Sequence, residues 1–291
     1  MGHEIHFPED TAMFKDLLVP ITDTPGDAAA IAAAAAIAGP RQARVAVLEF
    51  VNLPMPVSGP WATGDLALGD LYATFQEQGR KDAQAWRDKL AQLAPEVSAE
   101  VRLLESFVAD GPSLAAEQAR YADVTILPMV ADARRDGASI RAFFASVLLE
   151  SGRPVLLVPA QGNWREPRHA VVSWRPTSEA ARALHDALPL LRDTASVDVV
   201  VVGQEHDAQA PNPGDDIAAH LARHGVNARA VSLVAPHERI AATLLGHAQA
   251  SAADLIVAGG YGHSRFREWM MGGVTADLLA NPGTIPILFS H

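Results

Sequence analysis

The stretch FKDLLVPITDTPGDAAAIAAAAAIA, Phe14 to Ala38, decides the fold because the chain repeats it in altered form. The second copy reads PRHAVVSWRPTSEAARALHDALPLL, Pro167 to Leu191. Each copy contains a short apolar run, a turn rich in Pro, Thr or Ser, and an alanine-rich segment with apolar residues at helical spacing. Both copies therefore predict a buried strand, a turn and a helix.

Two later pairs of segments repeat in the same order. YADVTILP at Tyr121–Pro128 resembles AADLIVAG at Ala252–Gly259, and RPVLLVP at Arg153–Pro159 resembles TIPILFS at Thr284–Ser290. A shared order of three pieces predicts two copies of one domain. We expect the domains at residues 1–160 and 167–291, joined by the segment AQGNWREP.

The order of elements predicts an α/β fold. Runs such as VDVVVVG are apolar throughout, which is typical of parallel strands covered on both faces. In the second copy the expected strands are Ala170–Trp174, Val197–Gly203, Ala228–Leu233, Leu255–Ala258 and Ile285–Phe289. The expected helices between them are Ser178–Arg192, Gly214–Arg223, His237–Ala250 and Val274–Ala280. This rhythm predicts two doubly wound, open, parallel five-stranded sheets with helices on both faces.

The first copy follows the same order but is longer between its second and third strands, where we expect a loop and a long amphipathic helix. The final strands of the two copies are the natural edges at which the sheets could pair, and pairing would cover both exposed edges.

The composition excludes several classes of function. The 291 residues carry a net charge of −11, which argues against a broad nucleic-acid or anionic-membrane surface. The chain has no cysteine, which excludes disulfides, thiolate catalysis and Cys-type zinc sites and fits a cytoplasmic location. No signal pattern or bilayer-spanning run is present. The sequence leaves open whether the protein forms a homodimer and whether it binds an unidentified protein partner.

A glycine-rich run, GGYGHSRFREWMMGGVT, begins where the expected strand ADLIVA ends and leads into the last expected helix. Glycine lets a ligand approach the backbone, and successive free amides before a helix can bind phosphate oxygens. In open α/β sheets, ligands bind at this carboxyl edge of the strands. The candidate binding residues in the run are Gly259, Gly262, His263, Ser264, Arg265, Gly272, Gly273, Val274 and Thr275.

Residues at the ends of neighbouring strands complete the candidate site. Val201 or Val202, at the end of the second strand of this copy, is expected to line the base side of a bound nucleotide. Trp174 either stacks on a base or packs beneath the following helix. Arg175 either meets phosphate or is a solvated surface residue.

The spacing of Gly259, Gly262 and Gly272 (glycine, two residues, glycine, nine residues, glycine) resembles the ATP-binding branch of the universal stress protein family. The resemblance extends over both copies. It implies an adenine nucleotide alpha hydrolase-like fold, an intramolecular pseudo-dimer, and ATP or another adenine nucleotide, with or without Mg²⁺, as ligand. It also implies a role in stress response or signalling. The sequence departs from the family pattern at Gly273, where the family has Ser or Thr, and at Arg175, where ATP-binding members tend to carry Asp.

The first copy lacks these glycines. Aligning Asp123 with Asp254 puts Pro128 at the position of Gly259 and Ala131 at that of Gly262. Pro128 has no N–H to donate. We therefore expect the first copy to be a structural partner that does not bind nucleotide in this way.

Two other functions stay open: a nucleotide-independent scaffold that contacts a partner through the segment FREWMM, and a very slow ATPase. The sequence shows no paired carboxylates, no nucleophile–base pair and no metal-ligand cluster, so we assign no catalytic or metal-binding residue. This absence favours a binding module over an enzyme.

Overall fold

The computed structural model describes residues 14–53, 65–107, 110–130, 132, 134, 136–161, 163–203, 212–261, 273–280 and 283–291. The elements of the first half are β1 (Asp16–Pro20), α1 (Asp27–Arg41), β2 (Arg44–Leu53), α2 (Asp65–Leu93), β3 (Ser98–Phe107), α3 (Gly111–Ala119), β4 (Val124–Pro128), α4 (Gly137–Glu150) and β5 (Val155–Val158). Those of the second half are β6 (His169–Ser173), α5 (Ser178–Leu191), β7 (Ser196–Gly203), α6 (Pro213–Arg223), β8 (Ala228–Val234), α7 (Ile240–Ala250), β9 (Leu255–Gly259), α8 (Val274–Ala280) and β10 (Ile287–Ser290).

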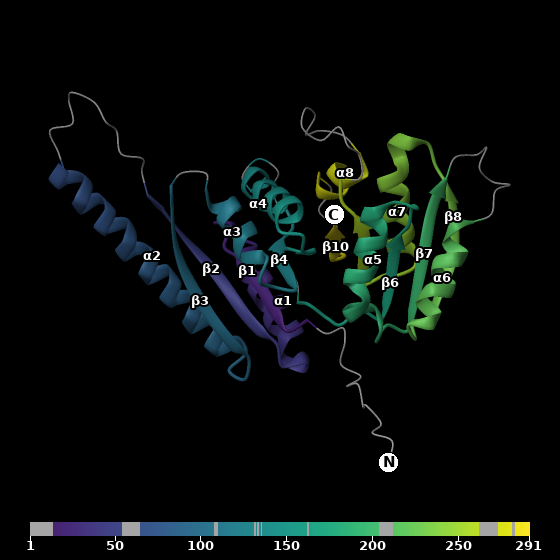
Figure 1. Cartoon of the computed structure of the whole chain (residues 1–291), viewed down its shortest axis with the longest axis horizontal. Helices are drawn as coiled ribbons and strands as arrows, with labels where there is room; N and C mark the ends of the chain where they lie inside the picture. The colour runs from purple at the N-terminus through teal and green to yellow at the C-terminus, as the bar shows by residue number, and fades with distance from the viewer. Residues whose placement is uncertain are drawn as a thin grey trace, which may run out of the picture.

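The strands form one sheet in the order β3-β2-β1-β4-β5-β10-β9-β6-β7-β8. All neighbours are parallel except β5 and β10, which pair antiparallel in the register Ile287–Leu157. Each half contributes five strands in the same order, counted outward from this seam. The expected doubly wound sheets are thus confirmed, and so is their pairing through the last strand of each half. Figure 1 shows the result, with the two halves on either side of β10.

Successive strand residues point to opposite sides of the sheet, and apolar residues point to both sides. Helices therefore cover both faces. Leu17 belongs to an apolar cluster that includes residues of α1, α2, α5 and α6. Its neighbour Leu18 belongs to the opposite cluster, which includes residues of α3, α4, α7 and α8. Each cluster extends across both halves, so the core is continuous through the seam.

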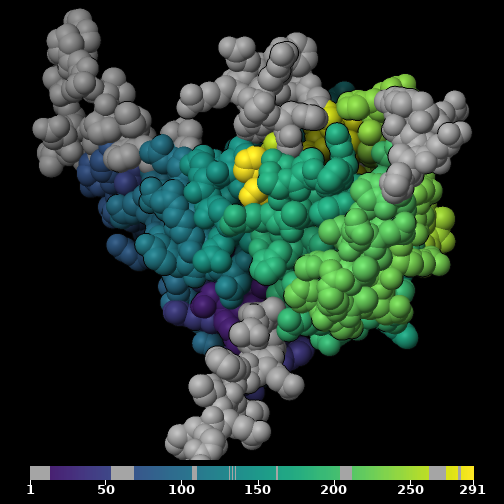
Figure 2. Space-filling model, turned by 45° about the vertical axis from the view of Figure 1, so that its right-hand side comes forward, coloured from purple at the N-terminus to yellow at the C-terminus, as the bar shows by residue number. Residues whose placement is uncertain are grey.

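The seam is packed by aromatic side chains from both halves. Phe144 of α4 and Phe289 of β10 are fully buried, and their rings meet edge to face at 5.3 Å. Phe144 also lies 6.0 Å from the ring of Tyr261, which follows β9. In Figure 2 the yellow C-terminal atoms reach the surface at this junction of the halves.

The expected boundaries differ from the observed ones by a few residues. The segment expected as one helix at 237–250 begins as a 3-10 turn, His237–Arg239, and continues as α7. Strand β10 begins at Ile287 rather than Ile285. No described helix is long and apolar enough to cross a membrane.

Candidate functional site

The candidate site lies where β6 and β9 end side by side, since Ser173 pairs with Ala258. Of the predicted residues, the structure describes Gly259, Gly273, Val274, Thr275, Trp174, Arg175 and Val202. The other predicted residues, Gly262, His263, Ser264, Arg265 and Gly272, lie outside the described residues.

Gly259 is packed against the first turn of α5. A Cβ atom at this position would lie 2.7 Å from the backbone nitrogen of Ala180 and 2.8 Å from the carbonyl carbon of Glu179. Both distances are shorter than real Cβ contacts, so only glycine fits without a backbone shift. The glycine therefore permits close contact between β9 and α5, a role that the sequence did not reveal.

The first half has an equivalent strand–helix contact, but there the glycine lies on the helix side and the larger residue on the strand. The strand registers pair Leu17 with Val124 and Ala170 with Leu255, so Pro128 of β4 is equivalent to Gly259 of β9. Gly26, which precedes α1, is equivalent to Glu179. A Cβ on Gly26 would lie 2.5 Å from Cβ of Pro128. In each half, then, one side of the strand–helix contact is glycine.

Gly273 directly precedes α8. Gly273 has φ +121, a conformation that favours glycine, and a Cβ there would meet no atom within 4 Å among those described. The half-buried Val274 begins α8, and the hydroxyl of the following residue, Thr275, accepts a hydrogen bond from Tyr261 N at 3.2 Å. This bond ties the residue after β9 to the first turn of α8.

The three remaining residues do not converge on one point. Trp174 is buried in the same apolar cluster as Ala180 and Leu184, beneath α5. Val202 packs toward the opposite cluster. Arg175 is exposed at the end of β6. The structure thus places Trp174 and Val202 on opposite faces of the sheet, with the indole packed as a core side chain.

The equivalent edge of the first half carries carboxylates. Asp27, buried at the start of α1, accepts hydrogen bonds from Thr22 N at 3.1 Å, Thr22 Oγ1 at 2.6 Å and Thr24 N at 3.0 Å. Glu49, buried in β2, accepts a hydrogen bond from Trp86 Nε1 of α2 at 2.9 Å. The sequence analysis missed this cluster, although a glutamate inside the apolar run RVAVLEFV was a visible signal.

Burial makes these carboxylates hard to ionise. Burial raises the pKa of Glu49 to about 7, the Trp86 hydrogen bond opposes the rise, and the charges of Asp23, Asp82 and Asp27 add to it. Burial also raises the pKa of Asp27, against hydrogen bonds from Thr22 and Thr24. Only above about pH 7, where Glu49 ionises, does this edge gain the negative charge that repels phosphate.

The second half has neutral or basic residues at the equivalent positions. The registers pair Asp16 with Arg44 and His169 with Ser196, so Val201 is equivalent to Glu49. By the same alignment Ala180 replaces Asp27 and Arg175 replaces Thr22. The two carboxyl edges thus differ at these three positions, while Glu179, whose pKa is lowered by a backbone hydrogen bond, keeps one carboxylate beside Gly259 in the second half.

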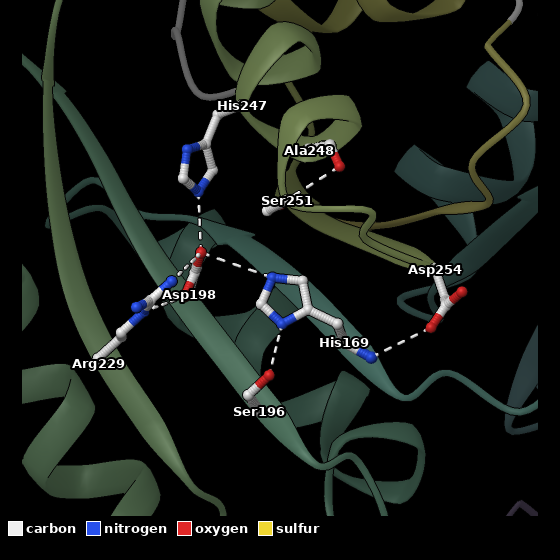
Figure 3. Close-up of polar contacts among 8 residues, drawn as sticks. All are labelled: His169, Ser196, Asp198, Arg229, His247, Ala248, Ser251 and Asp254. Carbon is white, nitrogen blue, oxygen red and sulfur yellow. Dashed lines mark hydrogen bonds and ion pairs between the residues drawn. The ribbon is translucent and has the colours of Figure 1, made fainter.

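A second polar cluster lies at the amino end of β7 (Figure 3). The fully buried Asp198 accepts hydrogen bonds from Arg229 Nε at 2.6 Å and bonds His247 Nε2 at 2.9 Å, while His169 Nε2 lies 3.5 Å away. Burial would raise the pKa of Asp198, but the hydrogen bonds and charges of these partners outweigh it and lower the pKa. This carboxylate therefore stays charged and links β7, β8 and α7.

The described residues contain no group of three or more His, Asp or Glu side chains that could hold a metal ion. Ser196 Oγ lies 2.6 Å from His169 Nδ1. The charge of Asp198, however, is already shared by Arg229 and His247, so the Ser196–His169 pair lacks a dedicated carboxylate.

Comparisons with known proteins support the fold. No protein-family model matches the sequence, and no curated protein matches it either. A universal stress protein from Archaeoglobus fulgidus superposes with a TM-score of 0.67 at 13% identity, covering 94% of this chain and 95% of that chain. A functionally unknown protein from Pseudomonas aeruginosa PAO1 gives a TM-score of 0.56 at 16% identity, covering 95% and 92% of the two chains. The chain therefore has the fold of a universal stress protein over nearly its whole length.

Proposed function

We propose that this chain is a tandem universal-stress-type protein that binds one adenine nucleotide, ATP, ADP or AMP, in its C-terminal half and acts in stress response or signalling. The domains are residues 1–160 and 167–291. The observation that carries the proposal is the contrast between the two carboxyl edges. Carboxylates occupy the edge of the first half, whereas Arg175, Val201 and Ala180 stand at the equivalent positions of the second half.

The main chain of the second half supplies the other support. Gly273 leads into α8 with φ +121, and no atom of the described residues lies within 4 Å of a Cβ placed there, which would let a ligand approach this backbone. We assign the phosphates to the glycine-rich run, with Gly262 and Gly272 as its central residues, and we assign Arg175 as their cationic contact. Of the two candidates for the adenine side, Val201 and Val202, we assign Val201, which packs against the same apolar cluster as Trp174.

The difference between the two edges can be tested by adding to the second half a carboxylate that the first half has. Val201→Glu places a carboxylate where the first half has Glu49. At pH 8 we expect ATP affinity to fall about tenfold or more by calorimetry, because like charges repel in a partly buried site. Val201→Gln is the matched neutral control and should lose less. Equal ATP affinity in Val201→Glu and the parent, with normal thermal unfolding, would contradict the site assignment.

A variant in the glycine run tests the phosphate contacts. Gly262→Val should abolish ATP binding without unfolding the protein, because side-chain atoms would occupy the phosphate path. The purified protein, once denatured, should also release a nucleotide detectable by absorbance and mass.

A nucleotide-independent scaffold is the second candidate, and two observations favour it. Gly259 is explained by its contact with α5, and the Thr275 hydroxyl is already bonded to Tyr261 N. If this reading holds, the purified protein carries no nucleotide and does not respond to added ATP, and it retains its partners when the glycine run is altered.

A further inference from the structure

Strand β8 is one free edge of the ten-stranded sheet, because it pairs with β7 on one side and with no described strand on the other. Figure 1 shows β8 at the outer end of the second half, while β3 lies at the outer end of the first half. The N–H and C=O groups along a free edge can pair with a strand of another molecule.

The backbone hydrogen bonds at the two ends of β8 show which of its residues face outward. Just before β8 begins, the carbonyl of Asn227 accepts a hydrogen bond from Val197 N of β7 at 2.8 Å. Just after β8 ends, Ala235 N donates to the carbonyl of Gly203 at 3.1 Å. Bonding residues alternate along a strand, so the odd-numbered residues between these two bonds face β7. The outward groups belong to the even-numbered residues, Ala228, Ala230, Ser232 and Val234.

Strand β8 lacks the features that protect a free edge. Its register with β7 continues without a bulge over all seven residues, and it contains no proline. Its one charged side chain, Arg229, turns back to the buried Asp198 of β7, with Nε and Oδ1 2.6 Å apart. Val234, at the end of the strand, is 54% exposed. Natural sheets protect free edges with charges, prolines or bulges, so an uncovered β8 would be unusual.

The other free edge, β3, is protected by charge and by a side chain of α2. Its ten residues include the charged Glu100, Arg102 and Glu105. The carbonyl of Val101 already accepts a hydrogen bond from Arg87 Nη2 of α2 at 3.1 Å. Of the two edges, β8 is therefore the one that suits pairing with another strand.

We propose that two copies of this chain pair through β8, antiparallel and about a two-fold axis at Val231, so that their sheets become continuous. Val231 is the midpoint of β8, and pairing about it places Ala230 of each copy opposite Ser232 of the other. The outward N–H and C=O groups of both strands then have partners. The same kind of contact, antiparallel and between edge strands, joins the two halves at β5 and β10.

Helix α6 fits this arrangement. Its first turn lies over the space between β7 and β8, because a Cβ on Gly214 would lie 3.2 Å from both Ala230 Cβ and Val201 Cγ2. The α6 helices of two paired copies are then separated by two strand spacings, about 10 Å, a distance at which helices pack. They run antiparallel, so the acidic first turn of one, with Asp215 and Asp216, lies beside the basic last turn of the other, with Arg223. These opposite charges favour the paired state.

Sedimentation equilibrium of the full-length protein tests the proposal. The parent should be a dimer at concentrations up to about 100 µM. Ala230→Pro removes one outward N–H from each copy, a change that an edge strand tolerates, and should weaken the dimer by about tenfold or more. In hydrogen exchange, the amides of Ser232 and Val234 should exchange slowly in the parent and faster in Ala230→Pro.

Two lysine variants provide a matched control. Ser232→Lys places a charge on β8 and should dissociate the dimer, whereas Ser98→Lys makes the same change on the exposed start of β3 and should leave it intact. A parent that stays monomeric would overturn the proposal. A dimer that persists undiminished in folded Ala230→Pro would also overturn it, because another surface would then join the copies. If Ala230→Pro does not fold, Ser232→Lys decides: undiminished association overturns the proposal. None of these outcomes depends on whether the chain binds nucleotide.

Discussion

At the scale of single residues, Glu49 should control how stability depends on pH. Its pKa is about 7 in the folded chain and near its usual value of 4.5 when unfolded. Between these values the unfolded state loses a proton that the folded state keeps, so the free energy of unfolding falls as pH rises through this window. Glu49→Gln keeps an acceptor for Trp86 and should raise the free energy of unfolding by about 2 kcal/mol at pH 8, with little change at pH 4. Urea unfolding at both pH values measures this, and an equal gain at both would contradict the assignment.

Asp198 makes the free energy of unfolding depend on pH in the opposite direction. Because its folded pKa is lowered, its charge contributes stability above the ordinary carboxyl range, near pH 4, and that stability is lost as pH falls further. Arg229→Met should lower the free energy of unfolding at pH 7, since the buried carboxylate then keeps only histidine partners. The loss should shrink in unfolding experiments at pH 3. A pH-independent loss would indicate that Arg229 acts through its packing alone.

At the scale of elements, the contact between the fourth strand and the first helix of each half is set by one glycine. Gly26→Ala should lower the free energy of unfolding by about 1–3 kcal/mol, because its Cβ would collide with Pro128. Pro128→Gly should restore part of this loss when combined with Gly26→Ala, and denaturant unfolding of the two single variants and the double variant measures the coupling. Strictly additive effects would refute this contact as the reason for Gly26.

The same contact shows what the sequence could and could not predict. Apolar runs and helical spacing predicted the strands, the helices and the repeat, because those patterns are local. The cause of Gly259 was not predictable, because the backbone of α5 that meets it is remote in sequence. The sequence left open whether Val201 or Val202 shares a face of the sheet with Trp174, because that choice depends on the register of the strands. The carboxylates around Glu49 come from separate elements, and only the fold brings them together.

At the scale of the whole molecule, the antiparallel pairing of β5 and β10 turns two similar halves into one sheet with one continuous core. The halves differ in the side chains at their carboxyl edges. One edge carries Asp27 and Glu49, and the other has Ala180 and Val201 at the equivalent positions. The central claim is therefore one of asymmetry: one half binds an adenine nucleotide and the other does not.

Native mass spectrometry of the full-length protein with ATP tests this claim most directly, because it counts ligands per chain. The account predicts that the parent binds a single nucleotide per chain and that Val201→Glu, at the same ATP concentration, is mostly free of it. Two nucleotides per chain would contradict the exclusion of ATP from the acidic edge, and a parent with none would contradict nucleotide binding altogether.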